Sequence, residues 1–141
     1  MCNFIIIWGG FMINWKEDYE LGVTHIDEQH EKLFEIADRA YKLLTNEFVN
    51  DKYDKIISIL EELKQYTVFH FKSEEDYMLS IEYKKFFSHK VEHENFINTI
   101  NNIDLNKLDL NQDESVKEIL EFVVNWIDAH ILNEDKFIVA N

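Results

Sequence analysis

The sequence predicts an all-α protein, an up-down-up-down antiparallel four-helix bundle with a metal site in its core. The 141 residues include no proline, and the three glycines all precede residue 24, so little interrupts helix formation. Four segments repeat apolar residues at steps of three and four, as amphipathic helices do. Each apolar stripe carries histidine, and short connections between successive helices favour antiparallel packing around one core.

The first predicted helix covers residues 24 to about 48. Thr24 and Asp27 resemble a capping box at its start. The apolar stripe continues through His30, so this side chain is expected to face the core, whereas His25 lies on the polar face. That polar face also carries Gln29, Lys32 and Arg39. We therefore predict a surface position without a role for His25.

The second predicted helix opens at Asn50 or Asp51 and ends near Leu79. Its apolar stripe continues through His70 and Glu74. Side chains four residues apart project from one helix face, one turn apart, so this pair can reach one ion or two adjacent ions.

The third predicted helix covers about residues 82–102, with Ser80 as its cap, and the fourth covers about residues 114–138, with Asp113 as its cap. The third repeats the four-residue spacing in His89 and His93, which lie on its apolar stripe. The stretch between these two helices is the only long loop that the sequence predicts.

The fourth apolar stripe ends in His130, which two acidic residues follow. Helical spacing alone favours Glu134 as the partner of His130, because Asp135 lies about 140° around an ideal helix. However, Ile131, Asp135 and Ile138 form a second inward-leaning row. Spacing therefore leaves both carboxylates as candidates.

Five histidines and at least one carboxylate are thus predicted to meet in a single core. Each unsatisfied buried polar group costs roughly 1 to 3 kcal/mol, and a buried charge costs more. Metal coordination removes that cost. A site of imidazoles and carboxylates without thiolate suits iron, manganese, cobalt or zinc, and shared carboxylates hold two ions close together. Iron is the first expectation.

Composition limits the class of partner. The chain has 14 Lys+Arg against 28 Asp+Glu, a formal charge of −14, so it lacks the basic face that nucleic acid or an anionic membrane requires. A single cysteine, Cys2, cannot form an internal disulfide. We expect a cytoplasmic monomer without nucleic-acid or membrane partners, and the sequence identifies no partner protein.

We expect one bundle domain over residues 24–141, preceded by an N-terminal extension and arm over residues 1–23. Residues 4–8 form an apolar run without a positive flank or cleavage site, far shorter than the ~20 residues of a membrane span. We predict neither a signal peptide nor an anchor there. Either Met12 is the native start, or residues 1–11 pack along the bundle.

Taken together, these motifs resemble the hemerythrin family, specifically its single-domain bacterial members. The resemblance covers about Met12 to the C-terminus. It rests, in family order, on Trp15, Gly22, Ile26-Asp27-Glu28-Gln29-His30, His70-Phe71-x-x-Glu74, His89-x-x-x-His93, and Trp126-x-x-x-His130-Ile131-x-x-x-Asp135.

The resemblance implies an oxo- or hydroxo-bridged non-haem di-iron site that binds dioxygen reversibly, for storage, transport or delivery, in a protein that is not an enzyme. It implies that three histidines hold one iron, two hold the other and two carboxylates bridge both: respectively His89, His93 and His130; His30 and His70; and Glu74 and Asp135. Candidates to line the oxygen pocket, or equally to pack the core, are Phe71, Ile127, Trp126 and Phe34.

The chain departs from the family pattern at one position, and two other functions are alternatives to oxygen binding. The family commonly places leucine where Ile127 stands, so oxygen affinity and autoxidation rate do not carry over. A di-iron oxidase, peroxidase or nitric-oxide-handling protein would use more carboxylates and Glu-x-x-His pairs, whereas this chain offers five histidines and two carboxylates. An oxygen or redox sensor is the other alternative, although no fused signalling domain is seen.

Overall fold

The computed structural model describes residues 17–46, 52–103 and 113–139 and confirms the predicted helical bundle. Its main helices are α1 (Thr24–Leu44), α2 (Lys52–Ser80), α3 (Phe86–Asn101) and α4 (Asp113–His130). A short 3-10 helix, η1 (Glu17–Tyr19), precedes them, and a π turn, η2 (Ile131–Asp135), joins α4 to the final turn, α5 (Lys136–Val139).

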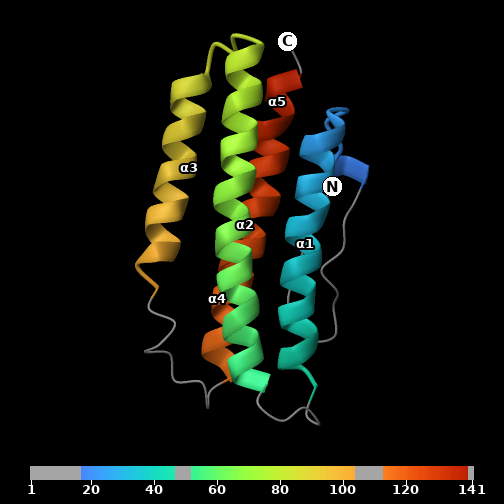
Figure 1. Ribbon diagram of the computed structural model, residues 1–141, viewed down its shortest axis with the longest axis vertical. Helices are drawn as coiled ribbons and strands as arrows, with labels where there is room; N and C mark the ends of the chain where they lie inside the picture. Colours follow the sequence, from blue (N-terminus) through green and yellow to red (C-terminus); the bar gives the residue numbers. More distant parts are fainter. Residues whose placement is uncertain (1–16, 47–51, 104–112, 140–141) are drawn as a thin grey trace.

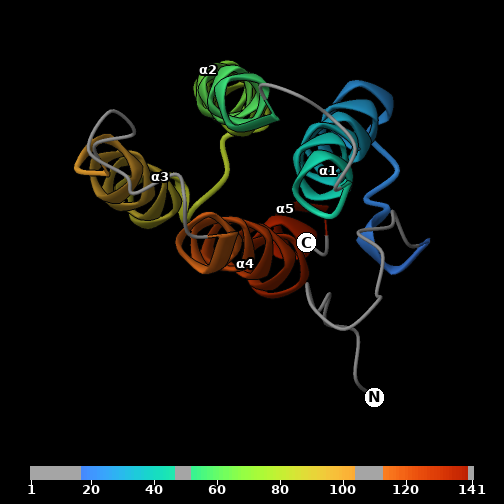
Figure 2. The same ribbon diagram turned by 90° about the horizontal axis from the view of Figure 1, so that it is seen from below.

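The four long helices run alternately up and down the bundle, as Figure 1 shows. Seen along the axis in Figure 2, they stand at the corners of a quadrilateral, with α5 continuing α4. The helix α1 packs against α2 and α4, and α3 packs against α2. The predicted antiparallel topology is therefore confirmed, and all four helices border one central space.

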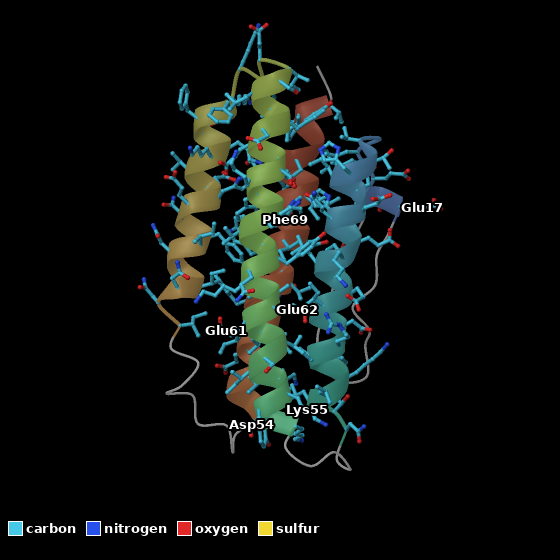
Figure 3. All side chains as sticks on the ribbon, in the orientation of Figure 1. Glu17, Asp54, Lys55, Glu61, Glu62 and Phe69 are labelled. Atoms are coloured by element: carbon cyan, nitrogen blue, oxygen red, sulfur yellow. The ribbon has the colours of Figure 1, made fainter. Side chains whose placement is uncertain are left out.

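The apolar stripes form the core, as predicted. Side chains fill the space between the helices in Figure 3, whereas Glu17, Asp54 and Lys55 are exposed on the outside. The largest buried cluster draws on all four long helices and includes Phe34, Leu60, Phe96, Leu120 and Ile127. No helix in the described ranges is both long and apolar enough to cross a membrane.

Two helix boundaries differ from the predicted ones. The helix α1 ends at Leu44, before the predicted limit near residue 48. The helix α3 begins at Phe86, because a tight turn precedes it in which Glu82 has a φ of +53°. Ser80 is not its cap: the hydroxyl of Ser80 donates to the carbonyl of Tyr77 within α2, at 2.6 Å.

The predicted capping box at the start of α1 is wrong. Thr24 is already helical, and Val23 before it makes no side-chain cap. Asp27 instead reaches back, and its carboxylate accepts hydrogen bonds from the backbone N–H groups of Leu21, at 2.7 Å, and Gly22, at 3.0 Å. Gly22 has a φ of +91°, which a residue with a Cβ adopts only with strain. Asp27 therefore holds the entry turn.

Several predictions fall on parts of the chain outside the described residues. These concern Cys2, the apolar run at residues 4–8, the start at Met12, Trp15 and most of the loop after α3. The side chain of Asp113, the predicted cap of α4, also lies outside them, although α4 begins at that residue.

Candidate metal centre

The four long helices and the π turn η2 bring all seven predicted ligands into one buried cluster. Each side chain is at most 5% exposed, although all seven are polar. The contributions are His30 from α1, His70 and Glu74 from α2, His89 and His93 from α3, His130 from α4, and Asp135 from η2. Their donor atoms form two overlapping groups, and within each group all atoms lie within 4.8 Å of one another.

The first group contains three imidazoles whose Nε2 atoms converge. The Nε2 atom of His130 lies 3.0 Å from that of His93 and 3.0 Å from that of His89. A neutral imidazole can aim one nitrogen lone pair at a metal ion while its other nitrogen carries the proton. This convergence is the arrangement that a metal ion bound by three histidines requires.

The second group contains two imidazoles. The Nε2 atoms of His30 and His70 lie 3.0 Å and 3.1 Å from Oε2 of Glu74. Asp135 contributes Oδ2, 3.1 Å from Nε2 of His30. This half of the cluster therefore has two nitrogen and two oxygen donors.

Each carboxylate presents one oxygen to each group. Besides its contacts with the second group, Glu74 places Oε1 3.1 Å from Nε2 of His93. Asp135 places Oδ1 2.9 Å and 3.0 Å from the Nε2 atoms of His89 and His130. Shared carboxylates of this kind hold two cations side by side in helical bundles. The donor sets are unequal, with three nitrogens and two oxygens on one side and two of each on the other.

The polar atoms of this cluster fit a pair of cations. Among the described residues, Oε1 of Glu74 and both carboxylate oxygens of Asp135 are buried without a hydrogen-bond partner. Such groups are costly in a protein interior unless they are paired or coordinate a metal. Burial alone would raise the pKa of Glu74 and Asp135, but the neighbouring histidines hold both pKa values below the usual range. Both carboxylates are therefore favoured in the charged form, which suits cation binding.

The imidazoles respond to the same two carboxylates. Burial lowers the pKa of His30 and His89, but the adjacent carboxylates of Asp135 and Glu74 outweigh it and raise these pKa values to about 9 and about 10. For His70, burial prevails and lowers the pKa. Cations compete with these protons, because a metal binds the deprotonated imidazole.

The π turn explains why Asp135, and not Glu134, enters the cluster. On an α-helix a four-residue step turns a side chain by about 40° and a five-residue step by about 140°. A π turn has roughly 4.4 residues, so five residues turn it by only about 50°. Asp135 therefore returns to the face of His130 and is fully buried. Glu134 is half-buried and borders a surface hollow beside Trp126.

One predicted surface residue belongs to the site. Gln29 was expected to face water with His25, but it is only 8% exposed. Its Oε1 accepts a hydrogen bond from Nδ1 of His70 at 2.8 Å, and its Nε2 donates to Ser73 at 3.1 Å. Gln29 comes directly before His30, at the edge of the apolar stripe, and that position is the sequence feature that could have indicated its burial. His25 is exposed, as predicted.

Aromatic rings cover the three-histidine group. Phe71 stacks on His93, with ring centroids 3.8 Å apart, and Trp126 stacks on His130 at 4.5 Å. Both rings therefore border the cluster, as expected for two of the four pocket candidates. Ile127 is buried, and Phe34 is buried and stacks on Tyr19 at 4.8 Å.

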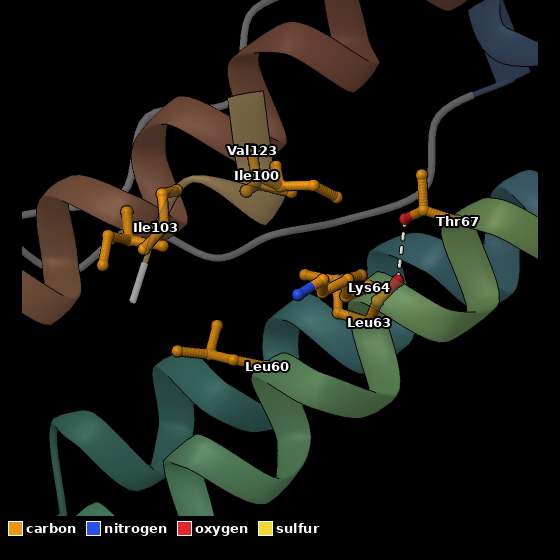
Figure 4. Close-up of a pocket in the computed structure, with 8 residues that line it drawn as sticks. Leu60, Leu63, Lys64, Thr67, Ile100, Ile103 and Val123 are labelled. Atoms are coloured by element: carbon orange, nitrogen blue, oxygen red, sulfur yellow. Dashed lines mark hydrogen bonds between the residues drawn. The ribbon is translucent and has the colours of Figure 1, made fainter. Parts of the chain in front are cut away.

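A separate apolar cavity of about 30 Å³ lies between α2, α3 and α4, shown in Figure 4. Leu60, Leu63, Ile100 and Val123 line it, together with Thr67, whose hydroxyl donates to the carbonyl of Leu63. The lining offers no imidazole or carboxylate, so this cavity is not a second metal site.

The chain is similar to known proteins along most of its length. The model of the family described as "Hemerythrin HHE cation binding domain" matches residues 21–140, which include the whole cluster. The chain is 52% identical over 125 residues to a bacteriohemerythrin of Clostridium acetobutylicum, covering 89% of this chain and 97% of that protein. It is 30% identical over 122 residues to a bacteriohemerythrin of Pseudomonas paraeruginosa, covering 86% and 75% of the two chains.

Proposed function

Since the chain belongs to the hemerythrin family, we propose that its buried cluster holds two non-haem iron ions and binds dioxygen reversibly. The observation that carries this proposal is the pair of carboxylates, each of which offers one oxygen to each of two histidine groups. Such a site stores, transports or delivers oxygen without turnover of a substrate.

In this proposal three histidines would hold one iron, two would hold the other, and two carboxylates would be shared between them. The sets are His89, His93 and His130; His30 and His70; and Glu74 and Asp135. The distances of 2.9 to 3.1 Å between Nε2 atoms and carboxylate oxygens support this division. Two iron ions held by these residues would supply the reversible electron transfer that dioxygen binding requires.

The residues of the chain favour reversible binding in two ways. The two-histidine half has one protein donor fewer than the three-histidine half, which leaves it more room for a small ligand. The cluster is buried, Phe71 and Trp126 stack on two of its histidines, and Ile127 belongs to the buried apolar core. An apolar, water-poor site disfavours charge separation and therefore slows the loss of reduced oxygen species.

Donor balance also separates this proposal from an oxidase or peroxidase. Five nitrogens against two carboxylates leave the iron less electron-rich than the carboxylate-dominated sites that activate dioxygen.

The test is an optical spectrum and an iron count on the purified full chain, after anaerobic reduction, after admission of oxygen and after its removal. We expect about two irons per chain and a visible charge-transfer band that appears with oxygen and disappears without it. Irreversible oxidation by oxygen, with turnover of a product, would refute the carrier function and support the enzymatic alternative.

A further inference from the structure

The two halves of the cluster differ in what their imidazoles contact on the outer side. A metal-bound histidine uses one ring nitrogen for the metal and usually donates a hydrogen bond from the other. The acceptor of this second bond affects how strongly the ring donates to the metal. A carboxylate acceptor draws the proton away and enriches the ring in electrons, whereas a neutral amide mainly fixes its orientation.

Carboxylates stand behind the three-histidine half. The Nδ1–H group of His93 donates to Oε2 of Glu75 at 2.9 Å, and the side chain of Glu75 is only 15% exposed. Glu92 places Oε2 3.3 Å from Nδ1 of His130, with its side chain 44% exposed. Because solvent screens exposed charges, Glu75 has the stronger influence of the two.

A neutral group stands behind the two-histidine half. The Nδ1–H group of His70 donates to the amide oxygen of Gln29, which Ser73 holds in place. The Nδ1 atom of His30 is buried and has no hydrogen-bond partner within the described residues. The chain therefore places negative charge behind one half and an uncharged amide behind the other.

We propose that Glu75, with a smaller contribution from Glu92, is a positioning residue that makes the two iron sites electronically unequal. Glu75 makes His93 a stronger electron donor and adds negative charge near the three-histidine half. An iron ion there would therefore be bound more tightly, and its reduction potential would be lower because the ferric form is stabilised. An iron ion in the two-histidine half, where Gln29 lies behind His70, would have the higher reduction potential. This inference rests on the proposed di-iron centre.

The test is spectroelectrochemistry of the iron-loaded full chain, which resolves two one-electron potentials. In Glu75→Gln, we expect the lower potential to rise while the upper one moves less, because only the three-histidine half loses its carboxylate. In Gln29→Glu, we expect the upper potential to fall. Glu94→Gln is the matched control, since Glu94 is exposed and follows His93 directly in α3, and this substitution removes the same charge.

Release of iron to a chelator provides an independent readout. Loss of an outer-shell partner typically weakens metal binding about 10- to 100-fold. We therefore expect Glu75→Gln to accelerate the slower of two release phases by about that factor, and Glu94→Gln to leave both phases unchanged.

Three results would overturn the inference. The first is that the potentials in Glu75→Gln move no more than in Glu94→Gln. The second is that both potentials rise equally in Glu75→Gln, and the third is that Gln29→Glu leaves the upper potential unchanged. A chain that loads fewer than two irons would overturn the di-iron centre and this inference together. Unequal potentials without reversible oxygen binding would instead refute only the carrier function, so the two failures can be distinguished.

Discussion

Deleting Asn133 is expected to preserve the metal site, although Asn133 lies between two of the ligands in the sequence. Asn133 is an exposed residue of the π turn between His130 and Asp135. Removing it shortens the step between these two ligands from five residues to four. The π turn can then relax into regular α-helix, because the extra residue that it accommodates is gone.

The magnitude follows from helix geometry. Five residues of π turn rotate Asp135 by about 50° from His130, and four residues of α-helix rotate it by about 40°. The carboxylate therefore moves around the helix axis by only about 10°. Deleting the exposed Ala129 instead, one residue before His130, rotates His130 by about 100° away from the cluster. Each deletion removes one exposed residue from the continuous helical segment formed by α4, η2 and α5.

The assay is the iron count of each purified variant, with circular dichroism as a check on folding. We expect the deletion of Asn133 to retain the iron stoichiometry of the parent chain and the deletion of Ala129 to lose iron. If the deletion of Asn133 loses as much iron as that of Ala129 while remaining helical, the π turn is not a one-residue insertion, and the geometric account of Asp135 is wrong.

Three further predictions concern single substitutions. His70→Ala and His130→Ala should each lose iron, and the free energy of unfolding in chemical denaturation should fall by about 1 to 3 kcal/mol, because buried polar groups lose their partner. His25→Ala is the surface control. Unchanged iron content in both core variants would contradict the ligand assignment. Asp135→Asn should lose iron whereas Glu134→Gln retains it, and the reverse outcome would make Glu134 the bridge. Tyr19→Phe should lower the free energy of unfolding by about 1 to 3 kcal/mol, because the buried Tyr19 hydroxyl donates to Asp128; an unchanged urea midpoint would contradict this.

The helices and the inward-facing ligands could be predicted from the sequence because both depend on local periodicity. His30, His70, His89, His93 and His130 all continue apolar stripes, and a helix fixes which residues share a face. The spacing of four residues in two helices then predicted which side chains meet. These predictions required no knowledge of how the helices pack.

Positions at the edge of a stripe could not be assigned in this way. Gln29 lies between the polar and apolar faces of α1, and its burial is decided by α2, whose His70 and Ser73 meet its amide. The role of Glu75 likewise depends on α3, because His93 on that helix donates a hydrogen bond to Glu75. Helical periodicity within one segment contains no information about the side chains of its neighbour.

By itself, the sequence determined that four helices present five histidines and at least one carboxylate to a common core, because period and spacing are local properties of the chain. Helical spacing left Glu134 and Asp135 open, and the family resemblance favoured Asp135; only the structure gave the physical reason, since the π turn departs from the ideal α-helical angle and brings Asp135 beside Glu74. The tertiary structure also decided how the two carboxylates divide their oxygens between unequal histidine groups, because that division depends on where the helices place their side chains relative to one another.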